Sequence, residues 1–227
     1  MTMLGLLTIG QAPRPDGLAR DVQQIVGPHI KVIERGALDG FSQEELAQAR
    51  PAAGDYLLVT LLADGTSVRI AKRPILDRLQ QQIDCLEAED RVNATLLMCT
   101  GSFPAFRHRS PLIQPQHALY GVVIGLAGAR PVGSLIPLPE QVDQARQKWR
   151  EMGAATALVF PADPYGESPH AAIEEAATQA REQGAGILFM DCFGYDLAMG
   201  AVARQAFGGP VIVARSLAAR LAAEVMA

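Results

Sequence analysis

Residues 94–102 read A-T-L-L-M-C-T-G-S, and this stretch decides the fold because it joins a buried strand to a reactive side chain. The apolar run up to Met98 is typical of a strand that is covered on both faces. It ends at the thiol of Cys99, and small hydrogen-bonding residues follow at once. Residues 186–194, G-I-L-F-M-D-C-F-G, repeat the arrangement around Cys192. We therefore predict two similar halves whose cysteines face each other across a cleft.

Apolar runs alternate with helical patterns along the whole chain. Residues 3–9 form the first run, which ends at Gly10 and a loop rich in turn-forming residues. The motif S-Q-E-E at residues 42–45 is a capping box and predicts a short helix. The Asp-Gly pair at residues 64–65 predicts a hairpin. Because strands that alternate with helices build parallel sheets flanked by helices, the predicted fold class is α/β.

The strand–helix pattern restarts near Pro131, which predicts two lobes rather than one wide sheet. We expect an N-terminal lobe over residues 1–114 and a C-terminal lobe over residues 115–213, with a last helix within residues 214–227 that packs back on the first lobe. Residues 104–115 are expected to be irregular. Ligands of open parallel sheets bind beyond the carboxyl ends of the strands, so the cysteine loops should line the binding site.

Composition excludes several classes of protein. Nearly half of the 227 residues are apolar, the net charge is −4, and no Lys/Arg cluster indicates a nucleic-acid partner. The longest apolar stretch, residues 118–129, is too short to cross a bilayer, and the N-terminus lacks the features of a signal peptide. An odd number of cysteines favours reduced thiols in the cytoplasm. The four histidines show no metal-ligand spacing, so we expect no metal.

Cys99 and Cys192 are the candidate catalytic residues. Each follows a strand and precedes an expected helix start, where amide groups and the helix dipole favour a thiolate. A thiolate can remove a proton from carbon, and a thiol on the opposite side can return one. The alternative is that both are small buried hydrophobic residues, which is common for free cysteine. Cys85 lies within a helical apolar pattern and is expected to be structural.

The loop after the first strand is a candidate anion site, because its Gly turn offers backbone N–H groups and Arg14 offers a forked guanidinium. In the alternative, Gly and Pro only shape the turn and Arg14 points to water. The role of Asp191 stays open: it caps a helix or it forms a salt bridge. The candidate substrate-binding residues are Thr8, Gly10, Gln11, Arg14, Thr100, Gly101, Ser102, Phe193 and Gly194.

Five segments carry a resemblance to a known family. They are L-L-T-I-G-Q-A-P-R-P-D at 6–16, L-L-V-T-L-L-A-D-G at 57–65, P-V-G-S-L-I-P-L-P-E-Q at 131–141, G-A-G-I-L-F-M-D-C-F-G at 184–194, and A-R-L-A-A-E at 219–224. With these segments the chain resembles the AroM family, which is in turn similar to the aspartate/glutamate racemase superfamily. Hydantoin racemase, maleate isomerase and arylmalonate decarboxylase are further relatives in that group.

The resemblance implies two similar Rossmann-like lobes with an active-site cleft between them, no cofactor, and a cysteine from each lobe. By position, Cys99 is the thiol of the first lobe and Cys192 that of the second, and the turn at Gly10 and Gln11 is the anion loop. Amino-acid racemases usually have Cys-Asn-Thr and Gly-Cys-Thr at these places, whereas this chain has C-T-G at 99–101 and D-C-F at 191–193. The groups that would hold an amino-acid substrate are therefore altered, while the two thiols are retained.

The predicted function is a cofactor-independent racemase, epimerase or isomerase that acts on a small carboxylate-bearing molecule, as a cytoplasmic homodimer. Two alternatives stay open. One is a small-anion binding or regulatory protein that keeps this fold. The other is an isomerase or decarboxylase that uses a single cysteine.

Overall fold

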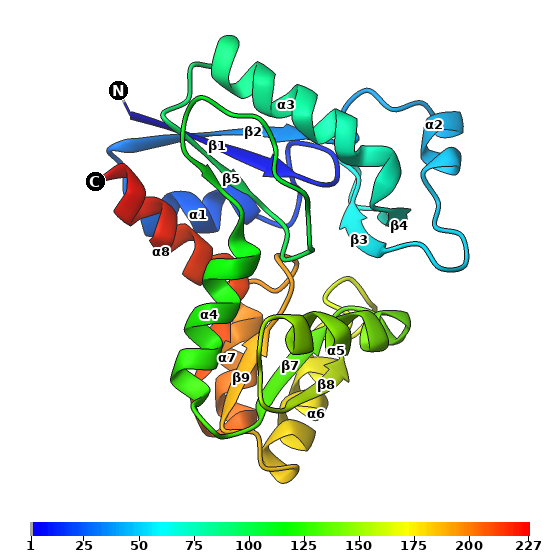
Figure 1. Cartoon of the computed structure of the whole chain (residues 1–227), viewed down its shortest axis with the longest axis vertical. Coiled ribbons are helices and arrows are strands. Elements are labelled where there is room, and N and C mark those ends of the chain that lie inside the picture. The colour runs from blue at the N-terminus through cyan, green and yellow to red at the C-terminus, as the bar shows by residue number, and fades with distance from the viewer. Residues whose placement is uncertain (1) are drawn as a thin grey trace. The chain divides into compact units, whose positions relative to one another are not determined.

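The computed structural model describes residues 2–227, and the chain divides into two compact units (Figure 1). Unit 1 comprises the chain up to Pro115 together with Ala218–Ala227, and unit 2 comprises Gln116–Leu217. Each unit has a parallel sheet of its own, which confirms the prediction of two α/β lobes rather than one wide sheet.

Unit 1 is built on a four-stranded parallel sheet in the order β2-β1-β5-β6, with a separate antiparallel hairpin β3-β4. Figure 1 shows α1 and α3 on opposite sides of the sheet. The elements are β1 (Thr2–Thr8), α1 (Leu18–Val26), β2 (Ile30–Gly36), α2 (Gln43–Gln48), β3 (Leu57–Leu61), β4 (Ser67–Ala71), α3 (Leu76–Ala88), β5 (Ala94–Leu97) and β6 (Leu112–Ile113).

Unit 2 is built on a second four-stranded parallel sheet, in the order β10-β9-β7-β8. Its last helix, α8, begins in unit 2 and ends within the residues assigned to unit 1. The elements are α4 (Pro115–Ala127), β7 (Val132–Ile136), α5 (Val142–Glu151), β8 (Ala157–Pro161), α6 (Pro169–Glu182), β9 (Ile187–Met190), α7 (Leu197–Phe207), β10 (Val211–Val213) and α8 (Ala214–Met226).

Two local predictions are confirmed at atomic detail. The capping box forms at α2, where Glu45 N donates to Ser42 Oγ and Ser42 N donates to Glu45 Oε2. The hairpin turn forms at Asp64 and Gly65, where the carboxylate accepts from Thr66 N at 2.8 Å and Gly65 has a φ of 89°. A positive φ costs glycine little, because it has no Cβ, and this explains the Asp-Gly signal.

Two expectations about the segment after Cys99 are wrong. The short strand β6 pairs with β5 inside the stretch expected to be irregular, since two residues are too few to show a periodicity. No helix starts beside Cys99 either: among residues 2–227 the next one is α4, at Pro115. Pro104 and Pro111 interrupt this segment, and a residue before proline avoids helical dihedrals.

Each unit has its own apolar core. Unit 1 packs aliphatic side chains of β1, β3, α3 and β5 together, whereas unit 2 adds an aromatic cluster of Tyr120, Trp149 and Phe189. The ring centroids of Tyr120 and Trp149 are 4.1 Å apart, and Trp149 is fully buried. Within the described part of the chain, no helix is both long and apolar enough to pass through a membrane.

Candidate functional site

The turn after β5 holds the first thiol. Cys99 lies two residues beyond the end of the strand, is 9% exposed, and packs at the margin of the apolar core of unit 1. The backbone N–H of Gly101 donates to Cys99 Sγ at 3.3 Å. A Cβ on Gly101 would lie 3.1 Å from the Phe103 ring and 3.2 Å from a methyl group of Leu58, so these side chains would have to shift slightly to accept one.

The turn after β9 repeats this hydrogen bond in unit 2. Cys192 lies two residues beyond the strand and is partly exposed, and Gly194 N donates to Cys192 Sγ at 3.3 Å. A Cβ on Gly194 would collide with the Tyr165 side chain, which would have to move to accept one. The two units therefore present their cysteines in the same local geometry, as the matched sequence patterns predict.

Residues that flank the β3-β4 hairpin hold the Cys99 turn in place. Tyr56 Oη accepts from Ser102 N at 3.1 Å, and Lys72 Nζ donates to Ser102 O at 2.9 Å. The ammonium of Lys72 also lies 4.2 Å from the centroid of the Tyr56 ring. Burial lowers the pKa of Lys72 below its ordinary value. One tyrosine and one lysine thus bind both polar groups of the Ser102 backbone.

A buried arginine holds the Cys192 turn. Arg215, in the first turn of α8, is fully buried, and its Nε and Nη2 donate to Phe193 O at 2.9 and 2.7 Å. Tyr195 follows the turn and donates its hydroxyl to Ala162 O at 2.6 Å. Burial raises the pKa of Tyr195 well above its ordinary value, so its hydroxyl stays neutral.

Asp191 belongs to a buried polar cluster and not to the cysteine turn. Its Oδ2 lies 3.1 Å from Lys148 Nζ and accepts a hydrogen bond from the Tyr120 hydroxyl. The ammonium of Lys148 also lies 4.7 Å from the centroid of the Tyr120 ring. The salt-bridge alternative for Asp191 is therefore confirmed. A carboxylate and an ammonium are buried together here, since neither could be buried alone without a large desolvation penalty.

The loop after β1 places Arg14 inside unit 1. Its Nη1 donates to Thr8 Oγ1 and Thr60 Oγ1, both at 3.2 Å, and its Nη2 forms an ion pair with Asp16 Oδ2 at 2.9 Å. Arg14 is only 6% exposed, so the alternative in which it points to water is wrong. Sequence reasoning missed Thr60 and Asp16. The signal for Thr60 is a polar residue inside the apolar run L-L-V-T-L-L.

Gln11 and Gly10 tie this loop to its neighbours. Gln11 Nε2 donates to Leu38 O at 3.2 Å, and Gln11 Oε1 accepts from Ala63 N at 3.0 Å. A Cβ on Gly10 would overlap the carbonyl oxygen of Leu61, so the backbone must approach closely here. The side chain of Gln11 thus joins two neighbouring loops of unit 1.

Sheet pairing brings the predicted site residues of each unit to one edge. In unit 1, β1 pairs with β5 through Leu7 and Leu97, so the Arg14 loop and the Cys99 turn leave neighbouring strands. In unit 2, β9 pairs with β10 through Met190 and Val213, so the Cys192 turn and Arg215 leave neighbouring strands. Both sets lie at the carboxyl ends of parallel strands, where such sheets bind ligands.

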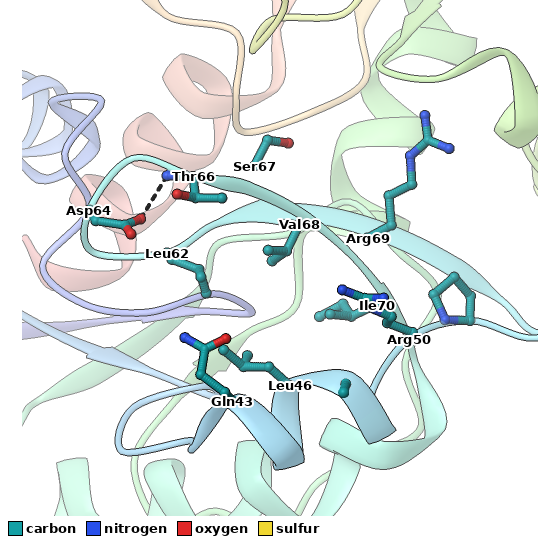
Figure 2. Close-up of a pocket in the computed structure, with 12 residues that line it drawn as sticks. Gln43, Leu46, Arg50, Leu62, Asp64, Thr66, Ser67, Val68, Arg69 and Ile70 are labelled. Carbon is teal, nitrogen blue, oxygen red and sulfur yellow. Dashed lines mark hydrogen bonds between the residues drawn. The ribbon is translucent and has the colours of Figure 1, made fainter.

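A hollow elsewhere on unit 1 contains none of these residues. Figure 2 shows it between α2 and the β3-β4 hairpin, with Arg50 and Arg69 among its labelled side chains. Its volume is about 790 Å³. Among the residues described as lining it there is no cysteine and none of the predicted binding residues. This hollow is therefore separate from the cysteine turns.

Glu34 offers a test of the electrostatics beside Arg14. Its carboxylate accepts from Arg14 N at 3.1 Å, and burial raises the pKa of Glu34 above its ordinary value. The folded state therefore binds this proton more tightly than the unfolded state, so the ionised carboxylate disfavours folding at neutral pH and this effect disappears as the pH falls through the raised pKa. Glu34→Gln, which keeps the accepting oxygen, is expected to raise the free energy of unfolding slightly at pH 7 and to leave it unchanged near pH 3.

Chemical denaturation at both pH values measures the effect of Glu34→Gln. Glu174→Gln, at an exposed position in the middle of α6, is the matched control and should change neither value. A Glu34→Gln protein that is less stable than the natural one at pH 7 would contradict the assignment.

Comparison with solved structures shows where this fold occurs. Allantoin racemase from Klebsiella pneumoniae matches with a TM-score of 0.66 at 15% identity, over 99% of this chain and 86% of that one. Picrophilus torridus aspartate racemase matches with a TM-score of 0.62 at 12% identity, over 99% and 95%. Glutamate racemase from Francisella tularensis subsp. tularensis SCHU S4, in complex with D-glutamate, matches with a TM-score of 0.60 at 13% identity, over 99% and 80%. At these identities the likeness shows a shared fold, the two-lobed fold of the racemases.

Comparisons of sequence identify the family. A search among curated proteins finds no match. The family model described as AroM protein matches residues 4–226, nearly the whole chain and all five segments on which the resemblance rests. The chain therefore belongs to the AroM family.

Proposed function

We propose that this protein is a cofactor-independent racemase, epimerase or isomerase that acts on a small carboxylate-bearing molecule through Cys99 and Cys192. The observation that carries the proposal is the repeated N–H···S hydrogen bond, which Gly101 makes to the first sulfur and Gly194 to the second. A cysteine that served only as a small apolar residue would need no such donor, and the fold is one that racemases share.

The proposed chemistry needs only the two sulfurs and the substrate. One cysteine, as a thiolate, removes a proton from a carbon next to a carboxylate or carbonyl group, and becomes a thiol. The other cysteine, as a thiol, delivers its proton to the opposite face of that carbon and becomes a thiolate. An amide N–H aimed at sulfur stabilises the negative charge in whichever cysteine carries it, because hydrogen bonds to ionised groups are stronger than those to neutral groups.

The proposed substrate-binding groups come from the two cysteine turns and from the loop after β1. Backbone amides and the hydroxyls of Thr8 and Thr100 are suited to an anion, and the buried guanidinium of Arg14, which is paired with Asp16, donates to the Thr8 hydroxyl. The proposed set remains the one expected from the sequence, namely Thr8, Gly10, Gln11, Arg14, Thr100, Gly101, Ser102, Phe193 and Gly194. We further propose that the protein is a cytoplasmic homodimer. Analytical ultracentrifugation of the purified protein tests its oligomeric state.

Hydrogen exchange at carbon tests the function. The natural protein is incubated in D₂O with single enantiomers of aspartate, glutamate and allantoin, and of further small chiral acids. Deuterium on the chiral carbon is followed by NMR and optical activity by polarimetry. For a substrate we expect deuterium to enter while optical activity is lost. Release of carbon dioxide, or a covalent adduct on one cysteine alone, would instead support the single-cysteine enzyme, and tight binding without any exchange would support a binding protein.

A further inference from the structure

One peptide group joins Arg215 to Cys192. The carbonyl of Phe193 accepts two hydrogen bonds from the guanidinium, and the N–H of Gly194 donates to Cys192 Sγ. This C=O and this N–H belong to the same planar peptide, so they point in opposite directions. The guanidinium therefore lies at the oxygen end of a dipole whose hydrogen end is directed at the sulfur.

Hydrogen bonds in such a chain strengthen one another. A cation that binds a carbonyl oxygen draws electron density toward it and makes the N–H of the same peptide a better donor, and the effect is larger where water is excluded. Arg215 is fully buried, and its two hydrogen bonds to one oxygen also fix the orientation of that peptide. The planar guanidinium stays charged throughout the accessible pH range.

We propose that Arg215 is a positioning residue that favours the thiolate of Cys192 by orienting and polarising the Phe193–Gly194 peptide. This deepens the proposed function, since it assigns the residue that prepares the second-lobe cysteine to act as a base.

The other charged and titratable groups around this turn do not supply that positive charge. Asp191 precedes the cysteine and is negative, and its partner Lys148 offsets that charge within the buried ion pair. Asp163 accepts from Tyr165 N, and both it and Tyr165 act on the Tyr195 hydroxyl, which stays neutral because burial raises its pKa. Among the described contacts of residues 192–194, Arg215 supplies the positive charge that is hydrogen-bonded to the turn.

Alkylation of the thiols tests the proposal without any substrate. The natural protein, Arg215→Lys and Arg215→Met are treated with iodoacetamide over pH 5–10, and the modification of each cysteine is followed by mass spectrometry of its peptide. For Arg215→Met we expect the pH midpoint of Cys192 alkylation to rise by about one unit, a tenfold loss of thiolate at neutral pH. Arg215→Lys keeps the positive charge but loses the planar guanidinium that makes two hydrogen bonds, so it should raise the midpoint of Cys192 less. Cys85, on α3, is the internal control, and the pH midpoint of its alkylation should not change.

A midpoint of Cys192 that stays the same in a folded Arg215→Met protein overturns the proposal, and so does an equal shift at Cys85. If Arg215→Met does not fold, the natural protein still tests the proposal. Its folded Cys192 must then be alkylated with a lower pH midpoint than the same cysteine in urea, and an equal or higher midpoint overturns the proposal. Failure of the D₂O experiment would not alter these midpoints, so the two proposals fail separately.

Discussion

Replacement of Cys99 or of Cys192 by serine is expected to abolish racemisation, with a loss of at least about 10³-fold in turnover of a substrate identified by deuterium exchange. General acid–base groups commonly contribute 10²- to 10⁴-fold, and a serine hydroxyl is a far weaker acid than a thiol and does not ionise at neutral pH. Each sulfur serves one face of the substrate carbon in the proposed mechanism, so the loss of either one blocks inversion.

The two serine variants are further expected to keep exchange from one face. Cys99→Ser should still incorporate deuterium into one enantiomer through Cys192, and Cys192→Ser into the other through Cys99, in both cases without inversion. NMR of each enantiomer in D₂O measures this directly. Cys85→Ser is the matched control, because it removes a thiol that makes no part of either turn, and it should retain full activity. Full turnover in both Cys99→Ser and Cys192→Ser would contradict the two-thiol mechanism.

Lys148→Met is expected to lower the free energy of unfolding by about 3–5 kcal/mol at pH 7. The ammonium lies 3.1 Å from Asp191 Oδ2, and the side chains of Lys148 and Asp191 are 9% and 0% exposed, so the substitution removes the cation of this ion pair while the carboxylate stays buried. The hydroxyl of Tyr120 then remains as a donor to that carboxylate, but it is neutral. Urea denaturation followed by the fluorescence of Trp149, which packs against Tyr120, reports the change.

A double variant separates the buried charge from the loss of packing. Lys148→Met combined with Asp191→Asn removes both charges and should recover a large part of the lost stability. Lys31→Met, at an exposed position of β2, is the control and should change stability by less than about 0.5 kcal/mol. A double variant no more stable than Lys148→Met would show that the charge is not the cause.

Local patterns predicted the elements that fold through neighbouring residues. The capping box at Ser42, the hairpin at Asp64 and Gly65, and the thiols just beyond two buried strands follow from residues a few positions apart. The strand β6 was missed because it exists only through its pairing with β5. The sequence predicts Gly101 and Gly194 as site residues, but only the structure shows the N–H···S hydrogen bonds that they make to Cys99 and Cys192.

The sequence by itself determined that this is a two-lobed α/β protein with a cysteine at the end of one strand in each lobe. Only the tertiary structure decided which partners the buried charges have: Arg14 reaches Thr60, Lys148 reaches Asp191, and Arg215 reaches the carbonyl of Phe193. The physical reason is that strands and turns arise from contacts between near neighbours in sequence. A buried charge, in contrast, must be satisfied by whichever distant segment the order of strands in the sheet brings beside it.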